Sequence, residues 1–356
     1  MSKRAKKREE NLKIYDDFER IISHEALFAA AQEASKGVNW KASVQRFKLN
    51  ACLCVDNLHK ELARGKDVRK GFIEFDIVER GKRRHIKSIH FSERVVQKSL
   101  CRNALYPVMV YNLIYDNGAN QKGKGTLFAT QRLEKHLRQH FRHYGRDGYV
   151  LLIDFKSYFD NIRHEPIKKE LRRRFQDKRL VSLADTFIDA FGEVSLGLGS
   201  ETSQMTAVAY PNKLDHYIKE VARIKGYGRY MDDSYVLHPS KQYLEELLVD
   251  IRRICDELGI KLNPQKTYIT DIKHGFLFLK TRFSLTETGK VIRKLCRKFI
   301  TIERRKLKKQ AKLVKQGVMT LDQVKVSFTS WRGSMVHRNA RRTVHSMDVL
   351  FRELFK

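Results

Sequence analysis

The chain has 356 residues and carries 72 Lys and Arg against 41 Asp and Glu, which gives a formal net charge of +31 at pH 7. Its 42% hydrophobic content is typical of a globular protein and excludes a globally disordered chain. The basic excess favours a polyanionic partner, and nucleic acid is the first candidate. No apolar run approaches the roughly 20 residues that span a bilayer, and the basic N-terminus lacks the apolar stretch of a signal peptide. We therefore expect a cytoplasmic protein with no membrane partner.

The first part of the chain is predicted to be mostly helical, with one hairpin. Apolar residues such as Phe18, Ile21 and Ile22 recur at helical spacing, and the segments on either side of Gly81 are typical of two strands joined by a turn. The predicted elements are a helical extension over 1–70, a hairpin at 72–90, a helix over 92–109, a glycine-rich basic loop at 116–125 and a helix over 126–143.

The second part mixes strands and helices and ends in a strongly basic segment. The predicted elements are a strand at 149–154, helices near 164–174 and 179–192, a loop at 196–201, a helix over 202–221, a hairpin within 228–237, an amphipathic helix over 244–258, a strand at 268–270 and an apolar run at 276–279. Gly259 is the expected C-terminal stop of the amphipathic helix. From Lys290 onward the composition turns strongly basic.

Three carboxylates stand where they contribute nothing to a core. Asp232 and Asp233 follow Tyr230 and Met231 at the tip of a predicted hairpin, and Asp154 ends a predicted apolar strand. Adjacent acids repel each other, and they become useful when a divalent cation neutralises them. We therefore predict that Asp154, Asp232 and Asp233 are catalytic and metal-binding residues of a two-metal phosphoryl-transfer site.

With these segments in order, the chain resembles a bacterial reverse transcriptase from about residue 70 to its C-terminus. The matching segments are 83–86, 154–159, 198–204, Tyr230–Asp233, 262–267 and 276–279. The resemblance implies an α+β right-hand polymerase with fingers, a palm of antiparallel sheet plus helices, and a helical thumb. Its expected divisions are a helical extension at 1–70, fingers with the start of the palm at 71–145, the palm at 146–285 and a basic helical thumb at 286–356.

The resemblance also implies a function and its partners. The chain would be an RNA-directed DNA polymerase that makes cDNA from dNTPs on an RNA template with a nucleic-acid primer. Two Mg²⁺ ions, with Mn²⁺ as an alternative, would be held by Asp154 and Asp232, with Asp233 contributing less directly. A dedicated non-coding RNA and an accessory protein are further candidate partners. The expected biological setting is a retroelement or a phage-defence system.

Further residues receive roles through the same resemblance. Lys266 would protonate or neutralise the leaving pyrophosphate. Phe159, five residues after Asp154, would lie under the sugar and exclude a 2′-hydroxyl by steric overlap, which predicts dNTPs over NTPs. The other candidates for contact with the nucleotide or template are Phe155, Arg84, Lys87 and Lys124, and of the three basic residues Arg84 is favoured because a guanidinium can bind phosphate bidentately.

The substrate loop departs from the commonest pattern of the family. Many reverse transcriptases have Gln-Gly followed by Ser-Pro, whereas here Leu198 and Gly199 are followed by Ser203 and Gln204. This variant resembles the enzymes of diversity-generating retroelements and several unclassified bacterial groups. Leu198, Gly199 and Gln204 are predicted to contact the nucleotide. Because Leu198 replaces a hydrogen-bonding amide, base selection is expected to be relaxed.

Two other functions fit part of the same pattern. An RNA-dependent RNA polymerase also uses an acid pair, and Asp160 could imitate its second acid, but Phe159 and the Tyr-Met before the acids count against it. A non-catalytic RNA-binding protein with a decayed palm should have lost at least one acid, whereas all three are present.

Overall fold

The computed structural model describes residues 10–79 and 82–356, so the predicted turn at Gly81 lies outside the described residues. The chain divides into two compact units. The first unit comprises Met1–Lys122, Phe155–Val221 and Asp250–Leu262, and the second comprises Gly123–Asp154, Ala222–Val249 and Asn263–Lys356. The four-part division expected from the sequence stays a prediction. Within the described ranges, no helix is long and apolar enough to cross a membrane.

The first unit is mostly helical. Its helices are α2 (Phe18–Ile22), α3 (His24–Ser35), α4 (Ala42–Leu49), α5 (Ala51–Ala63), α6 (Phe91–Leu100), α7 (Tyr106–Tyr111), α9 (Tyr158–Asn161), α10 (His164–Arg174), α11 (Lys178–Asp189), α12 (Glu201–Ala209) and α13 (Asn212–His216). Polar caps set several of the starts: the Asp17 carboxylate accepts from the first turn of α2, and Ser23 Oγ accepts from Ala26 N in α3. The apolar face of α3 is buried and packs on α2, α5 and α6.

The hairpin predicted at 72–90 is confirmed. Strand β1 (Phe72–Glu79) pairs antiparallel with β2 (Lys82–Ile89), in a register that sets Phe72 opposite Ile89. The single helix predicted over 202–221 is wrong, because Pro211 separates α12 from α13. Proline has no amide hydrogen to donate to the carbonyl four residues back, which belongs to Ala207. That carbonyl instead accepts a 2.6 Å hydrogen bond from Tyr158 Oη.

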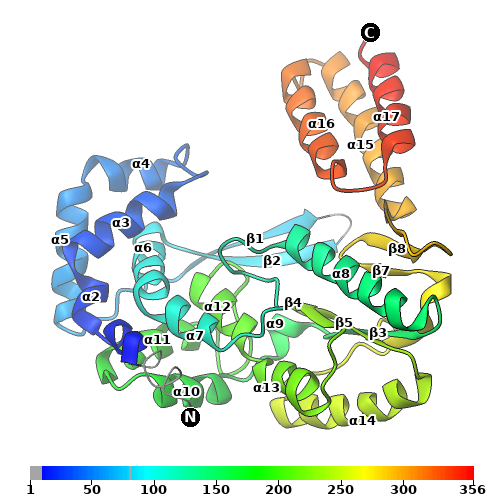
Figure 1. Cartoon of the computed structure of the whole chain (residues 1–356). Helices are drawn as coiled ribbons and strands as arrows, with labels where there is room; N and C mark the ends of the chain where they lie inside the picture. Colours follow the sequence, from blue (N-terminus) through cyan, green and yellow to red (C-terminus); the bar gives the residue numbers. More distant parts are fainter. Residues whose placement is uncertain (1–9, 80–81) are drawn as a thin grey trace. The chain divides into compact units, whose positions relative to one another are not determined.

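The second unit contains two antiparallel sheets. The four-stranded sheet has the order β4 (Tyr227–Tyr230), β5 (Asp233–His238), β3 (Tyr149–Asp154) and β6 (Tyr268–Asp271), and the three-stranded sheet has β7 (Phe276–Phe278), β8 (Thr281–Leu285) and β9 (Val291–Leu295). Helix α8 (Thr126–Tyr144) lies along the four-stranded sheet (Figure 1). One face of α8 and alternate residues of β3 and β5 share a core; its helix and strand members include Leu133, Leu137, Val150, Leu152, Tyr235 and Leu237.

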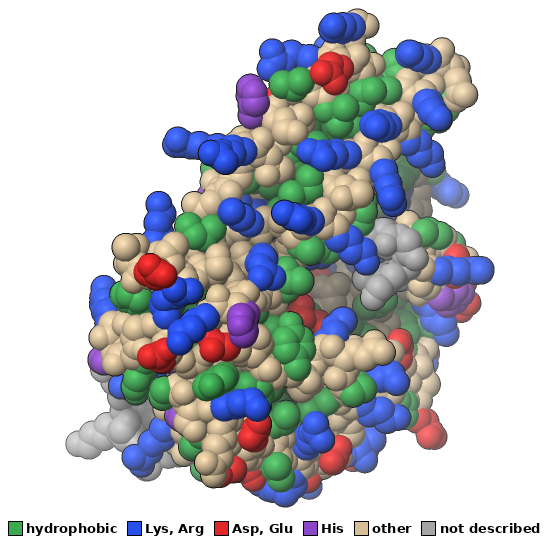
Figure 2. All heavy atoms as spheres, turned by 90° about the vertical axis from the view of Figure 1, so that its right-hand side faces the viewer, with side chains coloured by type: hydrophobic (Ala, Val, Ile, Leu, Met, Phe, Trp, Pro, Cys, Tyr) green, Lys and Arg blue, Asp and Glu red, His purple; other side chains and the backbone are tan. Residues whose placement is uncertain are grey.

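Two regions differ in detail from the sequence expectation. The amphipathic helix is confirmed as α14 (Lys241–Leu258), and Gly259 follows it with φ +71°. The basic segment after Lys290 opens with strand β9 instead of a helix and then forms α15 (Arg297–Lys315), α16 (Leu321–Met335) and α17 (Arg341–Leu354). These three helices surround a core of Leu307, Val324, Phe328 and Met347. Figure 2 shows Lys and Arg side chains spread over their surface.

Candidate active site

Three predicted carboxylates lie at one end of the four-stranded sheet. Strands β3 and β5 are antiparallel neighbours, and their register sets Asp154 opposite Asp233. Asp232 occupies the turn that joins β4 to β5. Cα atoms of directly paired residues in such a ladder lie about 4.5–5.5 Å apart. The sheet therefore brings together two acids that are 79 positions apart in the sequence.

A buried arginine supports the turn that carries the acid pair. Met231 has φ +57°, the left-handed conformation that a side chain rarely adopts. Arg229 is only 1% exposed, and its guanidinium donates a 2.9 Å hydrogen bond to the Met231 carbonyl. Gly228 leaves room beside it, since a Cβ there would lie 2.7 Å from Tyr235 Oη. Sequence reasoning missed the role of Arg229, because nothing in the local pattern distinguishes a buried arginine from a solvated one.

Asp154 is held by two donors from the segment after α14. Lys266 Nζ lies 2.6 Å from Asp154 Oδ2, and Asn263 Nδ2 donates to Asp154 Oδ1 at 2.9 Å. The backbone N–H of Asn263 also donates a 2.8 Å hydrogen bond to the backbone carbonyl of Asp154. Asp154 is 5% exposed, so these contacts supply the partners that a buried carboxylate needs. The structure thus places the predicted Lys266 against a predicted acid, and it adds Asn263, to which the sequence assigned no role.

Asp232 and Asp233 both have raised pKa values. Burial raises the pKa of Asp233 to about 7, and the charges of Asp232 and Asp154 add to this effect. Burial also raises the pKa of Asp232, with Asp154 adding to it and a backbone hydrogen bond, Lys266 and Arg229 opposing it. Burial alone would lower the pKa of Lys266, but its hydrogen bond to Asp154 and the three carboxylate charges outweigh that and raise it. Lys266 is therefore protonated at neutral pH.

The donor chemistry of this cluster fits a divalent cation. Carboxylates are the hard oxygen ligands that Mg²⁺ prefers. Burial raises the pKa of Asp233, and a cation would relieve the repulsion from Asp232 and Asp154 that adds to this effect. Each carboxylate oxygen of Asp154 accepts one hydrogen bond: Oδ1 from Asn263 and Oδ2 from Lys266. Among the described residues, no three His, Cys, Asp or Glu side chains are arranged as a ready-made metal site. Metal binding at Asp154 would thus require Lys266 to move away.

Phe155 and Phe159, the predicted nucleotide-binding aromatics, belong to the first unit. Phe155 is 2% exposed and lies in an isolated bridge with Leu262. Phe159 is half-buried on α9, with its ring edge-on to Tyr158 at a centroid distance of 5.8 Å. Its carbonyl accepts a 2.8 Å hydrogen bond from the Leu196 amide. The start of the substrate loop is therefore tied to the Phe159 backbone.

The substrate loop lies against the β1–β2 hairpin. A Cβ on Gly199 would be 3.2 Å from the Lys87 carbonyl of β2, so glycine permits this close approach. Gln204 Nε2 donates to the Leu198 carbonyl at 3.3 Å, and the Leu198 side chain is 38% exposed. Ser200 Oγ accepts from Ser203 N and donates to Gln97 Oε1 at 2.8 Å, which caps α12. The loop is thus preorganised by its own hydrogen bonds.

The basic residues predicted to contact phosphate are placed unevenly. Lys87 Nζ lies 3.9 Å from Glu74 Oε1 and 5.7 Å from the centre of the Phe72 ring. Lys124, in the second unit, lies 5.1 Å from the centre of the Phe128 ring. Arg84 belongs to β2, but its side chain lies outside the described residues.

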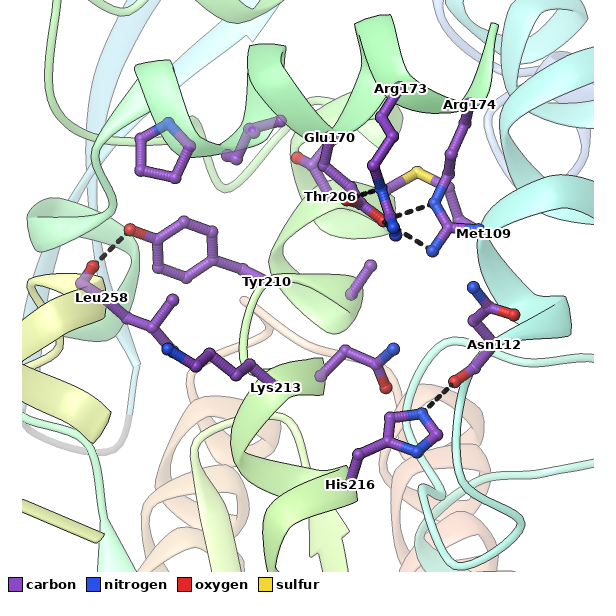
Figure 3. Close-up of a pocket in the computed structure, with 14 residues that line it drawn as sticks. Met109, Asn112, Glu170, Arg173, Arg174, Thr206, Tyr210, Lys213, His216 and Leu258 are labelled. Atoms are coloured by element: carbon purple, nitrogen blue, oxygen red, sulfur yellow. Dashed lines mark hydrogen bonds and ion pairs between the residues drawn. The ribbon is translucent and has the colours of Figure 1, made fainter. Parts of the chain in front are cut away.

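A cavity of about 450 Å³ lies elsewhere in the first unit, among α7, α10, α12 and α13 (Figure 3). Glu170 holds both Arg173 and Arg174, and His216 Nε2 contacts the Asn112 carbonyl at 2.8 Å. None of the residues predicted for the site lines this cavity. Glu170 pairs with two arginines inside the lining, whereas Lys213 pairs with Glu257, which is not a lining residue.

Comparison with known proteins identifies the family of the chain. The model of the family described as reverse transcriptase (RNA-dependent DNA polymerase) matches residues 69–283. The chain therefore belongs to the reverse transcriptase family, which confirms the resemblance read from the sequence. Protein YkfC of Escherichia coli (strain K12) is 26% identical over an alignment of 180 residues. The match covers 38% of this chain and 47% of that protein.

Solved telomerases are similar in fold. Telomerase from Candida albicans, solved in complex with the TWJ fragment of telomeric RNA, superposes with a TM-score of 0.50 and 11% identity, covering 69% of this chain and 51% of that chain. Apo telomerase from Candida tropicalis, truncated from its C-terminal domain, gives a TM-score of 0.49 with 12% identity over 63% of this chain and 55% of that chain. The predicted α+β right-hand polymerase fold is confirmed. The chain spans about half the length of these relatives.

Proposed function

We propose that this protein is an RNA-directed DNA polymerase that makes cDNA from dNTPs on an RNA template with a nucleic-acid primer. The observation that carries the proposal is the pairing of Asp154 with Asp233 across β3 and β5, with Asp232 in the adjoining turn and Lys266 at Asp154. Membership of the reverse transcriptase family supports the same reaction. The net charge of +31 fits a chain whose template, primer and nucleotide are all anions.

The carboxylates and Lys266 have distinct proposed roles. Asp154 and Asp232 would hold two Mg²⁺ ions, with Asp233 contributing less directly and Mn²⁺ as an alternative metal. When bound, such ions lower the pKa of the primer 3′-hydroxyl and neutralise the triphosphate. Lys266 Nζ, which is protonated and 2.6 Å from Asp154 Oδ2, would transfer a proton to the leaving pyrophosphate. Its side chain is 58% exposed, which leaves it free to turn from Asp154 towards a ligand.

The first unit would supply selection of the nucleotide. We assign the exclusion of the 2′-hydroxyl to Phe159. Contact with the incoming nucleotide is assigned to Phe155, Leu198, Gly199 and Gln204. The remaining proposed phosphate or template contacts are Arg84, Lys87 and Lys124. A dedicated non-coding RNA and an accessory protein are proposed as further partners, in a retroelement or a phage-defence system.

The test is radiolabelled nucleotide incorporation on a primed RNA template with Mg²⁺, comparing dNTPs with NTPs. The site variant is Asp232→Asn, which keeps the size of the side chain and removes its charge. Glu245→Gln is the matched control, because Glu245 pairs only with Lys241 on the surface of α14 in the described structure. Incorporation of dNTPs that is lost in Asp232→Asn and kept in Glu245→Gln supports the proposal. Preference for NTPs would support an RNA polymerase, and RNA binding without incorporation would support a non-catalytic role.

A further inference from the structure

The helices before the family-matched region carry a basic surface of their own. The family match begins at residue 69, whereas α4 and α5 end by Ala63. Residues 36–68 contain seven Lys and Arg against three Asp and Glu. Between Lys36 and Asn50 there are four basic residues and no acid. This part of the first unit is thus a candidate contact for a polyanion that the polymerase site does not explain.

An exposed tryptophan stands at the start of α4. Trp40 is 75% exposed, and Lys41 Nζ lies 5.6 Å from the centre of its ring. Lys48 Nζ donates a 3.2 Å hydrogen bond to Asn39 Oδ1, which brings a second ammonium group to the same turn. A large aromatic ring left in water contributes little to folding, but it offers a flat face on which a nucleic-acid base can stack.

One face of α4 borders a cavity of about 640 Å³ that also contains residues of α5 and of the start of α6. Arg46, Lys70 and His90 line it, and Glu61 is its one acidic lining residue in the described structure. Burial lowers the pKa of His90, and the positive charges of Lys70 and Arg46 lower it further. The three groups are therefore close enough to interact electrostatically. Across residues 10–79 and 82–356, neither Arg46 nor Lys70 makes an ion pair through its side chain.

We infer that this α4 surface, defined by Trp40, Lys41, Arg46, Lys48, Lys70 and His90, binds single-stranded RNA outside the polymerase site. Trp40 and Arg46 are six positions apart, and Trp40 lies two residues before the first residue of α4. A base stacks on Trp40, and phosphates occupy the cavity beside Arg46 and Lys70. Ser43 and Asn57 in the same cavity provide neutral polar contacts that suit ribose and base edges. The inference rests on the proposed function to the extent that RNA is the polymer this protein handles.

The first measurement uses the fluorescence of Trp40 in the full chain. The sequence contains two tryptophans, Trp40 and Trp331, so a Trp331→Phe background makes the signal specific to the α4 surface. The probe is an unstructured oligouridylate of about 15 nucleotides, a length near the upper range of one single-strand site. It is added without dNTPs and with a saturating primer–template duplex that occupies the polymerase site. We expect saturable quenching of Trp40.

The second measurement is the affinity of a labelled form of the same probe, under the same competition. Trp40→Ala should weaken binding about 5- to 100-fold, as expected for loss of one stacked base, whereas Trp40→Phe should retain most of it. The double variant Arg46→Gln/Lys70→Gln should make the slope of the logarithm of the binding constant against the logarithm of the salt concentration shallower, by about 0.7 per lost phosphate contact. Lys60→Gln is the matched control, because Lys60 pairs with Asp56 and lies outside the cavity. All of these side chains are exposed, so the variants should fold.

Three results would overturn the inference. The first is RNA affinity unchanged in both Trp40→Ala and the double variant. The second is the absence of Trp40 quenching at saturating probe. The third is quenching by phosphatidylserine vesicles and not by RNA, which would identify the exposed Trp40, Leu49 and Leu53 as a membrane contact. Extension of the primer–template duplex is scored separately, so failure of the proposed polymerase and failure of the α4 surface give different results.

Discussion

Neutralising Asp233 should make the metal-free protein more stable at alkaline pH. Burial, with the charges of Asp232 and Asp154, raises the pKa of Asp233 to about 7, against an ordinary value of 3.8. The difference of about 3 pKa units corresponds to about 4 kcal/mol of unfavourable free energy once the carboxyl is ionised in the folded state. Asp233→Asn removes the charge and keeps the shape. We expect a gain in the free energy of unfolding of about 2–4 kcal/mol at pH 8.

The pH window follows from the sign of the shift. Between pH 3.8 and about 7 the folded protein holds the Asp233 proton more tightly than the unfolded chain does, so the stability of the parent falls as the pH rises through this range. The variant lacks this loss. The gain should therefore be close to zero at pH 4 and complete at pH 8. The measurement is denaturant unfolding with EDTA at a series of pH values, followed by circular dichroism.

The control for this experiment is Glu245→Gln, which removes one exposed carboxylate from a surface pair on α14. Such pairs contribute at most about 0.5 kcal/mol, so this variant should follow the parent at every pH. Mg²⁺ supplies a further check, because a bound cation should stabilise the parent at pH 8 and narrow its difference from Asp233→Asn. A variant that is no more stable than the parent at pH 8 would refute the assignment of a buried, repelled carboxylate at this position.

Three further predictions concern the reaction itself. Lys266→Met should lower the rate of incorporation by about 10²–10⁴-fold, the usual contribution of a general acid, and a single-turnover assay that finds the parent rate would remove Lys266 from the chemistry. Phe159→Ala should admit NTPs, so the ratio of kcat/KM for dCTP over CTP should fall at least about 10-fold; an unchanged ratio would make Phe159 an ordinary core residue. Leu198→Gln should lower misincorporation on a sequenced template, and equal error rates would dismiss the relaxed selection predicted for this loop.

The parts of the fold that the sequence predicted are those with a local signature. The β1–β2 hairpin, α8, α14 and β3 each show a period of 2 or 3.6 or a continuous apolar run. The acid pair was readable because adjacent carboxylates at a hairpin tip have no structural use. The break at Pro211 also has a local signal, since proline lacks the amide hydrogen that a helix interior needs.

The parts that the sequence did not predict depend on partners far away in the chain. Asn263 is assigned to the site by its hydrogen bond to Asp154, 109 positions earlier. Arg229 is buried by its surroundings, and local composition carries no record of them. Strands β8 and β9 were missed because their register is defined by each other. In addition, β9 lies in the basic segment for which helix was expected. Pattern therefore identifies elements, whereas the tertiary fold decides which polar side chains become structural.

The same reasoning supports the carboxylate cluster as the proposed functional centre of the second unit. Asp154 has Lys266 and Asn263 as partners. Asp232 and Asp233 have raised pKa values; burial is the main cause, and the charges of neighbouring carboxylates add to it. A fold selected for stability alone would gain by neutralising Asp233. The sheet instead gathers three carboxylates beside a lysine whose side chain is 58% exposed. That arrangement costs stability in the metal-free protein and gives a divalent cation or a cationic ligand a reason to bind there.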